Sequence, residues 1–194
     1  MQSVNNTSCS DLTKQKIADA LKVLMQKKSF DKISVADITA YCDIHRQTFY
    51  YHFADKYELL NWIFHKELIA PLTQDFTLDN MYDKLNSMFI TMKDEQSFYQ
   101  RALKINADVI LNYINKLAVQ EFSQTFDDIE KAYNLNPKDD KENKLLAEFF
   151  GYGISGVVLD WVSRGMKETP KELTERIKHI IIACKRLAIS RADL

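Results

Sequence analysis

Residues Ser34 to Lys56 read SVADITAYCDIHRQTFYYHFADK and contain the signals for two short helices separated by a tight turn. Ser34 and Asp37 have the spacing of a capping box, which predicts that a helix of about eight residues begins at Ser34. The residues expected on its inward face recur at helical spacing and are Val35, Ile38 and Cys42. A turn at 42–44 and a helix at 46–53 follow. This succession predicts a helix-turn-helix unit.

The second helix of this unit has two different sides. At 100° per residue, Phe49 and Phe53 fall on one side, with Ile44 of the turn beneath them. Gln47 and Tyr51 lie almost opposite Phe49. We therefore expect an apolar side packed on the preceding helices and a polar side that faces solvent.

The outward side chains suit DNA. An arginine at 46 can bind guanine O6 and N7, a glutamine at 47 can bind adenine N6 and N7, and hydroxyl groups can donate to phosphate oxygens. Lys56 and free N–H groups at Ser34 would add phosphate contacts. The residues expected to contact DNA on these grounds are Ser34, His45, Arg46, Gln47, Thr48, Tyr50, Tyr51 and Lys56. A plain three-helix cluster with a solvated polar face is the alternative interpretation.

The rest of the chain also has helical patterns. A first helix is expected from Ser10-Asp11 to Lys27-Lys28, and a fourth from Asp55 to Ile69, where Pro71 ends it. Further helices are expected at 78–93, 95–105, 107–133, 141–165 and 170–190, with a break at 134–140. The fold class predicted is therefore all-α, with about nine helices.

These patterns divide the chain of 194 residues into three parts. Residues 1–10 form a flexible tail, residues 11–55 form the helix-turn-helix domain, and residues 56–194 form a helical domain for dimerisation and for effector or partner binding.

The last two helices are rich in apolar residues. Residues 145–162 are apolar on every face, Gly165 marks the end of that helix, and Thr169 with Glu172 forms another capping box. Two copies of such a helix pair make a four-helix bundle, so we expect a homodimer. The residues expected at its interface are Gly153, Val157, Trp161, Ile177, Ile181 and Cys184.

Charge and cysteine usage limit the classes of protein. The 26 basic and 27 acidic residues give a net charge of −1, so any DNA binding must be local. The three cysteines form no C-x-x-C pair, and they predict neither a disulfide framework nor a zinc site. The first ten residues are polar, and the uncharged stretch at 149–159 is too short to cross a bilayer. We therefore expect a cytoplasmic protein without a membrane partner.

Other motifs are weaker. The sequence GYGISG at 151–156 spells G-x-G-x-x-G, but it follows a helical segment and lacks the strand that a dinucleotide fold needs. No residues have the spacing of a metal site or a catalytic group, so no cofactor, no metal and no enzymatic activity are expected. Aromatic residues beyond the helix-turn-helix domain either form core or line an effector pocket, the pocket candidates being Phe89, Tyr99, Tyr113 and Phe150.

The segments DITAYCDI at 37–44, TFYYHF at 48–53 and KYELL at 56–60 together closely resemble the DNA-binding domain of TetR-family transcriptional regulators. Asp43 stands where this family usually has glycine, and an aspartate tolerates the left-handed conformation. His45 replaces a small capping residue, so a weaker cap is expected. The resemblance implies that Arg46 and Gln47 read bases and that Phe49 and Phe53 form core. It implies backbone contacts for Thr48, Tyr50, Tyr51, His52 and Lys56.

A finer resemblance lies in RQTFY at 46–50, ELL at 58–60, WIF at 62–64 and FYQ at 98–100, which are similar to regulators of dihydroxyacetone kinase operons. It implies an activator that works with a separate dihydroxyacetone-sensing partner protein, rather than a repressor with its own ligand pocket.

The function expected from all these features is sequence-specific regulation of transcription. A homodimer would bind a near-palindromic operator in double-stranded DNA, with the helix at 46–53 in the major groove and the two copies about 34 to 36 Å apart or a multiple of that distance. A small-molecule effector or a partner protein would control it. The alternative is an all-helical adaptor that binds a protein through Tyr50 and Tyr51 and contacts no DNA.

Overall fold

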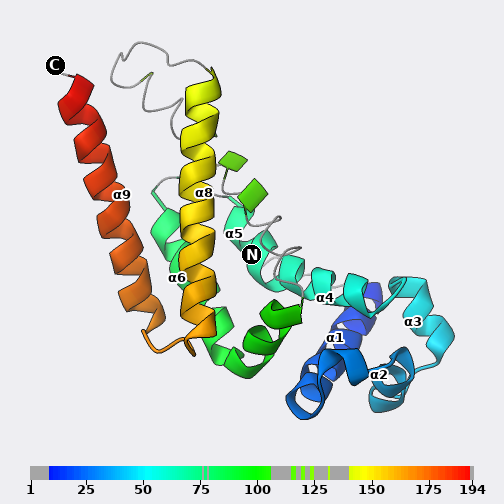
Figure 1. Cartoon of the computed structure of the whole chain (residues 1–194). Helices are drawn as coiled ribbons and strands as arrows, with labels where there is room; N and C mark the ends of the chain where they lie inside the picture. Colours follow the sequence, from blue (N-terminus) through cyan, green and yellow to red (C-terminus); the bar gives the residue numbers. More distant parts are fainter. Residues whose placement is uncertain are drawn as a thin grey trace, which may run out of the picture.

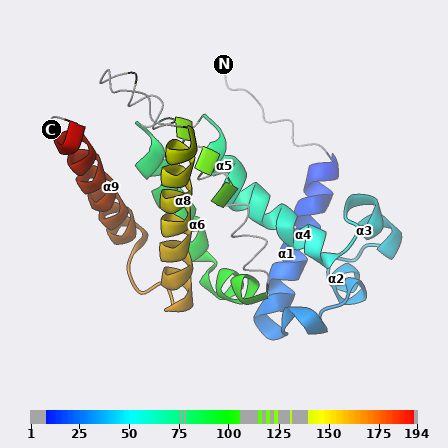
Figure 2. The ribbon, with the colours of Figure 1, turned by 45° about the horizontal axis from the view of Figure 1, so that its top comes forward.

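A computed structural model describes residues 9–75, 77, 79–105, 115–116, 119–120, 123–124, 131 and 140–192. Over these ranges the regular structure is helical, without a strand, so the all-α prediction is confirmed. Figures 1 and 2 place α1, α2 and α3 at one end of the molecule and the long helices α8 and α9 at the other, with α4 running between the two ends.

The N-terminal unit consists of α1 (Cys9–Lys27), a 3-10 turn η1 (Phe30–Lys32), α2 (Val35–Tyr41) and α3 (Arg46–His52). Its core holds fully buried residues from all of these elements: Ile17, Leu21, Met25, Phe30, Ile38 and Phe49. The turn between α2 and α3 contains Asp43 at φ 49°, which confirms the expected left-handed aspartate. The helix-turn-helix prediction is confirmed, and the first helix has the expected bounds within a residue or two.

The next helix does not end at Pro71 as the sequence predicts. It runs through α4 (Lys56–Phe64), a π-helical turn η2 (His65–Ile69) and α5 (Ala70–Thr73), and Pro71 lies inside α5. In the π turn, the N–H of Ala70 donates to the carbonyl of His65, five residues back. Pro71 stands in the first turn of α5, directly after the π turn, where a missing N–H is tolerated, so the prediction was wrong because it assumed one regular α-helix.

The remaining described helices are α6 (Met81–Asp94), a helix at 96–105, α8 (Asp140–Ser163) and α9 (Pro170–Ala192), and α6 packs against α9. The turn that ends α8 contains Gly165 as expected, with φ at 87°, and the N–H of Met166 donates to the carbonyl of Trp161 at 2.8 Å. The capping box before α9 is also confirmed, since the N–H of Thr169 donates to Glu172 at 2.8 Å. Most of the helix expected at 107–133, and the break at 134–140 except its last residue, lie outside the described residues.

Helix α8 has an unusual composition. Residues Lys144–Ser163 are long and apolar enough to cross a membrane by length and composition alone, which the shorter uncharged stretch at 149–159 did not indicate. One side of α8 is buried in the protomer, and Trp161 on that side packs 5.5 Å from Phe89 of α6 between ring centroids. α8 therefore contributes one side to the protomer core and leaves another side exposed.

Candidate nucleic-acid interface

The two sides of α3 differ as the sequence predicts. Phe49 is fully buried and Phe53 is 2% exposed, whereas Tyr50 is 57% and Tyr51 83% exposed. Gln47 is also exposed. Since burying an aromatic ring contributes most of the packing energy of so short a helix, Phe49 and Phe53 hold α3 in place while its polar side chains face solvent.

The first turn of α3 lacks a side-chain cap. His45 stands at the N-cap position, and its side chain makes no capping hydrogen bond. Its carbonyl accepts the N–H groups of Thr48 at 3.0 Å and Phe49 at 3.3 Å. This confirms the weaker cap expected from a histidine, and it leaves the exposed side chains of His45 and Arg46 in front of the helix.

Aromatic contacts order the outer surface of α3. Tyr50 meets the ring of Phe49 edge to face at 5.6 Å between centroids, and Tyr51 meets the ring of His52 in the same way at 5.0 Å. Edge-to-face pairs restrict ring rotation. The two tyrosine hydroxyls are thus presented outward on rings whose orientation is limited.

Ser34 caps α2 and does not offer free N–H groups. Its N–H and hydroxyl both donate to Asp37, at 2.8 and 2.7 Å, and its oxygen accepts the N–H of Asp37 at 3.1 Å. These bonds from Ser34, together with an ion pair to Lys28 at 3.0 Å, hold the pKa of the Asp37 carboxyl well below its usual range. The N–H of Ser34 itself is therefore used by the capping box that the sequence also predicted, whereas a phosphate contact at the start of α2 stays a prediction.

Lys56 points into its own protein. Its Nζ donates to the carbonyls of Phe30 at 2.9 Å, Asp31 at 3.3 Å and Ile33 at 2.9 Å, and it lies 4.6 Å from the centre of the Phe30 ring. An ammonium group has three N–H donors, so these carbonyls occupy all of them. This corrects the expectation that the Lys56 side chain contacts phosphate, and assigns it instead to fastening α4 to the turn after α1.

The end of α3 is joined firmly to α4. Asp55 accepts the N–H groups of Tyr57 and Glu58, both at 2.8 Å, which confirms it as the cap of α4. The rings of Phe53 and Trp62 meet edge to face at 5.8 Å. A change in the direction of α4 would therefore move α3 with it.

The residues expected at a dimer interface separate into two groups. Trp161, Ile177 and Ile181 are buried within the protomer, so they belong to its core and are not available to a second chain. Gly153 and Val157 are exposed, and a Cβ built at Gly153 meets nothing within 4 Å. The side chain of Cys184 lies outside the described residues.

The GYGISG motif lies within α8 and so has no place in a strand–loop–helix nucleotide site.

The sequence reasoning missed a larger exposed apolar surface on α8. Leu145 is 66%, Phe149 70% and Tyr152 58% exposed. On a helical wheel these residues and Gly156 fall within about 60° of one another. We call this the α8 face. The spacings of four, three and four residues between these positions are the sequence signal for this surface. The signal is hard to detect because apolar residues occur on every side of the segment.

The expected effector pocket is largely packed. Phe89 and Tyr99 are fully buried, and the Tyr99 hydroxyl donates to Glu67 at 2.7 Å. Phe150 is half-buried, and Tyr113 lies outside the described residues. Phe89 and Tyr99 thus follow the core interpretation that the sequence left open.

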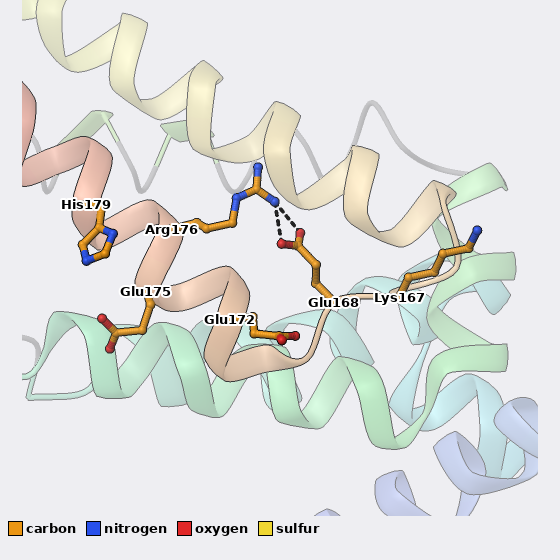
Figure 3. A pocket seen from close by; sticks show the side chains of 6 residues that line it. All are labelled: Lys167, Glu168, Glu172, Glu175, Arg176 and His179. Atoms are coloured by element: carbon orange, nitrogen blue, oxygen red, sulfur yellow. Dashed lines mark hydrogen bonds and ion pairs between the residues drawn. The ribbon is translucent and has the colours of Figure 1, made fainter.

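A hollow of about 490 Å³ lies elsewhere, on α9 and the segment before it (Figure 3). Its lining is charged, and Arg176 donates to both carboxylate oxygens of Glu168 at 2.6 Å. The lining residues are Lys167, Glu168, Glu172, Glu175, Arg176 and His179. It is open to solvent and shares no residue with the predicted pocket. Among the described residues, no group of three His, Cys, Asp or Glu could hold a metal ion.

Two family models match the chain. The one described as bacterial regulatory proteins of the tetR family matches residues 17–63, which include most of the helix-turn-helix unit. The one described as a transcriptional regulator C-terminal region matches residues 79–183. The two matches fall on the two ends of the fold described above.

Similar proteins agree with these matches. The HTH-type dhaKLM operon transcriptional activator DhaS of Lactococcus lactis subsp. lactis (strain IL1403) is 30% identical over 182 residues, or 92% of this chain and 93% of that protein. The solved structure of a dihydroxyacetone kinase operon activator DhaS has a TM-score of 0.68 at 23% identity and covers 91% of this chain and 97% of that chain. NalD of Pseudomonas aeruginosa, the secondary repressor of the MexAB-OprM multidrug efflux pump, has a TM-score of 0.56 at 15% identity, covering 90% and 96%.

These findings confirm both resemblances noted in the sequence, the general one and the one to regulators of dihydroxyacetone kinase operons. The two structures show the shared fold, and the full-length relative and the family models show the family. The chain belongs to the TetR family of transcriptional regulators.

Proposed function

We propose that two copies of this chain bind a near-palindromic operator and place each α3 in a major groove. The observation that carries the proposal is the division of α3 into a buried side at Phe49 and Phe53 and an exposed side at Gln47 and Tyr51. A helix that is anchored below and polar above has the form of a recognition helix. An adaptor surface would need no array of side chains matched to base edges.

Each exposed side chain of α3 has a role in this proposal. Arg46 and Gln47 bind base edges, because both can form paired hydrogen bonds in the major groove. Phosphate and sugar contacts come from hydroxyl and imidazole groups, which fix the position of the helix on the duplex. The residues proposed for these contacts are His45, Thr48, Tyr50, Tyr51 and His52. Ser34 and Lys56 act indirectly, since their side chains hold α2 and α4.

We propose the α8 face as the centre of the homodimer interface. Its aromatic and aliphatic side chains are exposed on the protomer surface, and Gly156 within the face and Gly153 beside it leave space for a close approach of another helix. Apolar patches of this kind on a protomer mark protein interfaces. This interface also includes Gly153 and Val157, which the sequence predicts at a dimer interface. It also accounts for the composition of α8 without a membrane, in keeping with a cytoplasmic regulator.

For control of the regulator, we propose a partner protein as the sensor. The relative's name describes a transcriptional activator of the dhaKLM operon, and we extend activation of a dihydroxyacetone kinase operon to this chain on that likeness. The packing of Phe89 and Tyr99 into the core supports sensing outside this chain. A small-molecule effector bound directly is the second candidate.

Selection from a random pool of double-stranded DNA tests the proposed function. The purified protein is expected to enrich an inverted repeat, with binding that weakens steeply as salt is raised because phosphate contacts release counterions. Enrichment of a DNA sequence without two-fold symmetry would contradict binding by a symmetric homodimer. No enrichment, together with capture of a protein through Tyr50 and Tyr51, would favour the adaptor.

A further inference from the structure

A partly buried group of charged and polar side chains joins the helix-turn-helix unit to the C-terminal helices. Lys22 of α1 is only 8% exposed, and its Nζ forms ion pairs with Glu67 of η2 and with Glu95 at 2.8 Å. The second oxygen of Glu67 accepts the hydroxyl of Tyr99 at 2.7 Å. We call these four residues the junction cluster. They connect α1, the π turn and the segment after α6.

Aromatic contacts and a hydrogen bond fix the position of the Tyr99 side chain. It is fully buried, its ring meets Phe64 of α4 edge to face at 5.6 Å, and Phe98 lies beside it at 5.1 Å. Burial, followed by the negative charge of Glu67, raises the pKa of Tyr99, so its hydroxyl remains protonated and donates. Glu67 therefore has one oxygen fixed by an ammonium group and the other by a hydroxyl.

The π turn brings Glu67 to this place. Buried residues of the helix come in pairs, Leu59-Leu60, Ile63-Phe64 and Leu68-Ile69. The first two pairs are four residues apart, and the last two are five residues apart, at η2. A regular helix would rotate everything after the extra residue by about 100° and so carry Leu68-Ile69 off the buried side. The π turn keeps all three pairs on one side and sets Glu67 against α1.

Such a cluster is suited to fixing an angle. Apolar contacts permit helices to slide, whereas a shielded ion pair with a shared hydroxyl has one good geometry, and loss of one partner leaves a charge unpaired. Arg101 adds a second connection, since its Nη1 donates to the carbonyl of Met25 in α1 at 2.8 Å. Both connections hold α1 against the same short segment, residues 95–101.

We propose that Lys22, Glu67 and Tyr99 are positioning residues that set the angle between the helix-turn-helix unit and the C-terminal helices, and thereby the half-site spacing that the dimer accepts. The inference rests on the proposed function, because that angle determines the distance between the two α3 helices. It adds a determinant of spacing that touches no DNA.

The first test varies the spacing of the selected duplex. Inserting or removing one base pair between the half-sites shifts them by about 3.4 Å along the axis. The unaltered protein is expected to prefer one spacing by about tenfold or more, and Tyr99→Phe to reduce that preference to within about threefold, while affinity for a single half-site stays the same. Tyr82→Phe is the matched control, because its ring contact with Lys178 persists in phenylalanine.

A preference that survives Tyr99→Phe and Lys22→Met, with only a lower melting temperature, would overturn the inference and leave the cluster a stabilising feature. Lys22→Arg, which keeps the charge, is expected to retain more of the spacing preference than Lys22→Met. A merely structural role would lower affinity equally at every spacing.

The second test needs no DNA. Nitroxide labels on Lys32→Cys and Arg164→Cys are placed in a Cys9→Ser and Cys184→Ser background, and the labelled protein is diluted with unlabelled protein. They report the distance between the helix-turn-helix unit and the end of α8 within one chain. Tyr99→Phe is expected to broaden the distance distribution, and Tyr82→Phe to leave it unchanged. An unchanged distribution in Tyr99→Phe would refute the positioning role even if DNA binding is confirmed. A broadened one would uphold it even if no operator is found.

Discussion

Helices α3 and α8 both expose aromatic side chains, but their surroundings differ. On α3, Tyr50 and Tyr51 are interleaved with arginine, glutamine and threonine, and on α8, Phe149 and Tyr152 are flanked by leucine and glycine. A surface with many donors and acceptors suits the polar edges of a duplex, whereas an apolar surface with space for a backbone suits another helix. Exposed aromatic rings therefore indicate a partner, and the neighbouring residues indicate which kind.

The largest effect is expected on the buried side of α3. Phe49→Ala removes a fully buried ring, which typically costs about 3 to 5 kcal/mol. Chemical denaturation followed by circular dichroism measures it. Phe149→Ala on α8 is the matched control, because that ring is 70% exposed in the protomer. The comparison is made at protein concentrations low enough to keep the chain monomeric. If both variants lose the same free energy of unfolding, the assignment of Phe49 to the core and of Phe149 to an exposed surface is contradicted.

A charge introduced on the α8 face tests whether this surface forms the dimer interface. Phe149→Glu is expected to weaken dimerisation by about 2 kcal/mol or more, as for residues at the centre of an interface. Sedimentation velocity over a range of concentrations measures the change, and Leu12→Glu, also at an exposed apolar residue, serves as a control. A dimer that is unaffected by Phe149→Glu would place the interface on a different surface.

A smaller effect is expected from a single phosphate contact on α3. Thr48→Val keeps the shape of the side chain and removes its hydroxyl, so affinity should fall by about 0.5 to 1.5 kcal/mol on operator and unrelated duplex alike. Titration of both duplexes by fluorescence anisotropy measures this. A loss confined to the operator would make Thr48 a base reader.

The smallest effect concerns the cap of α2. Because the folded pKa of Asp37 lies below its ordinary value of 3.8, the charged carboxylate stabilises the folded state above that value, and the contribution is lost as the pH falls. Asp37→Asn should therefore be less stable than the parent protein at pH 7, and the difference should shrink in acid. Thermal melts at several pH values measure it, and a difference that grows in acid would reverse the sign.

The parts of the fold that short-range chemistry determines were predictable. The caps at Ser34, Asp55 and Thr169 and the left-handed Asp43 each depend on residues within a few positions, and all are confirmed. The two sides of α3 followed from helical periodicity for the same reason. The five-residue step from Ile63-Phe64 to Leu68-Ile69 is also present in the sequence, but the periodicity of a regular helix does not account for it.

Features that depend on distant partners could not be predicted. Nothing near Lys56 shows that its ammonium group reaches carbonyls 23 to 26 residues earlier. Periodicity marks Ile177 and Trp161 as apolar but does not say whether the covering surface belongs to the same chain or to a second one. The same limit applies to the junction cluster, whose two carboxylates lie 45 and 73 residues from Lys22.

The claim that α3 reads bases is tested most directly with Arg46→Ala on the selected duplex and every single base-pair variant of it. We expect an affinity loss of about 1 to 3 kcal/mol and a loss of discrimination at one base pair, symmetrically in both half-sites. If Arg46→Ala weakens all duplexes equally and discrimination at every position is retained, Arg46 contacts only the backbone and the central claim is contradicted.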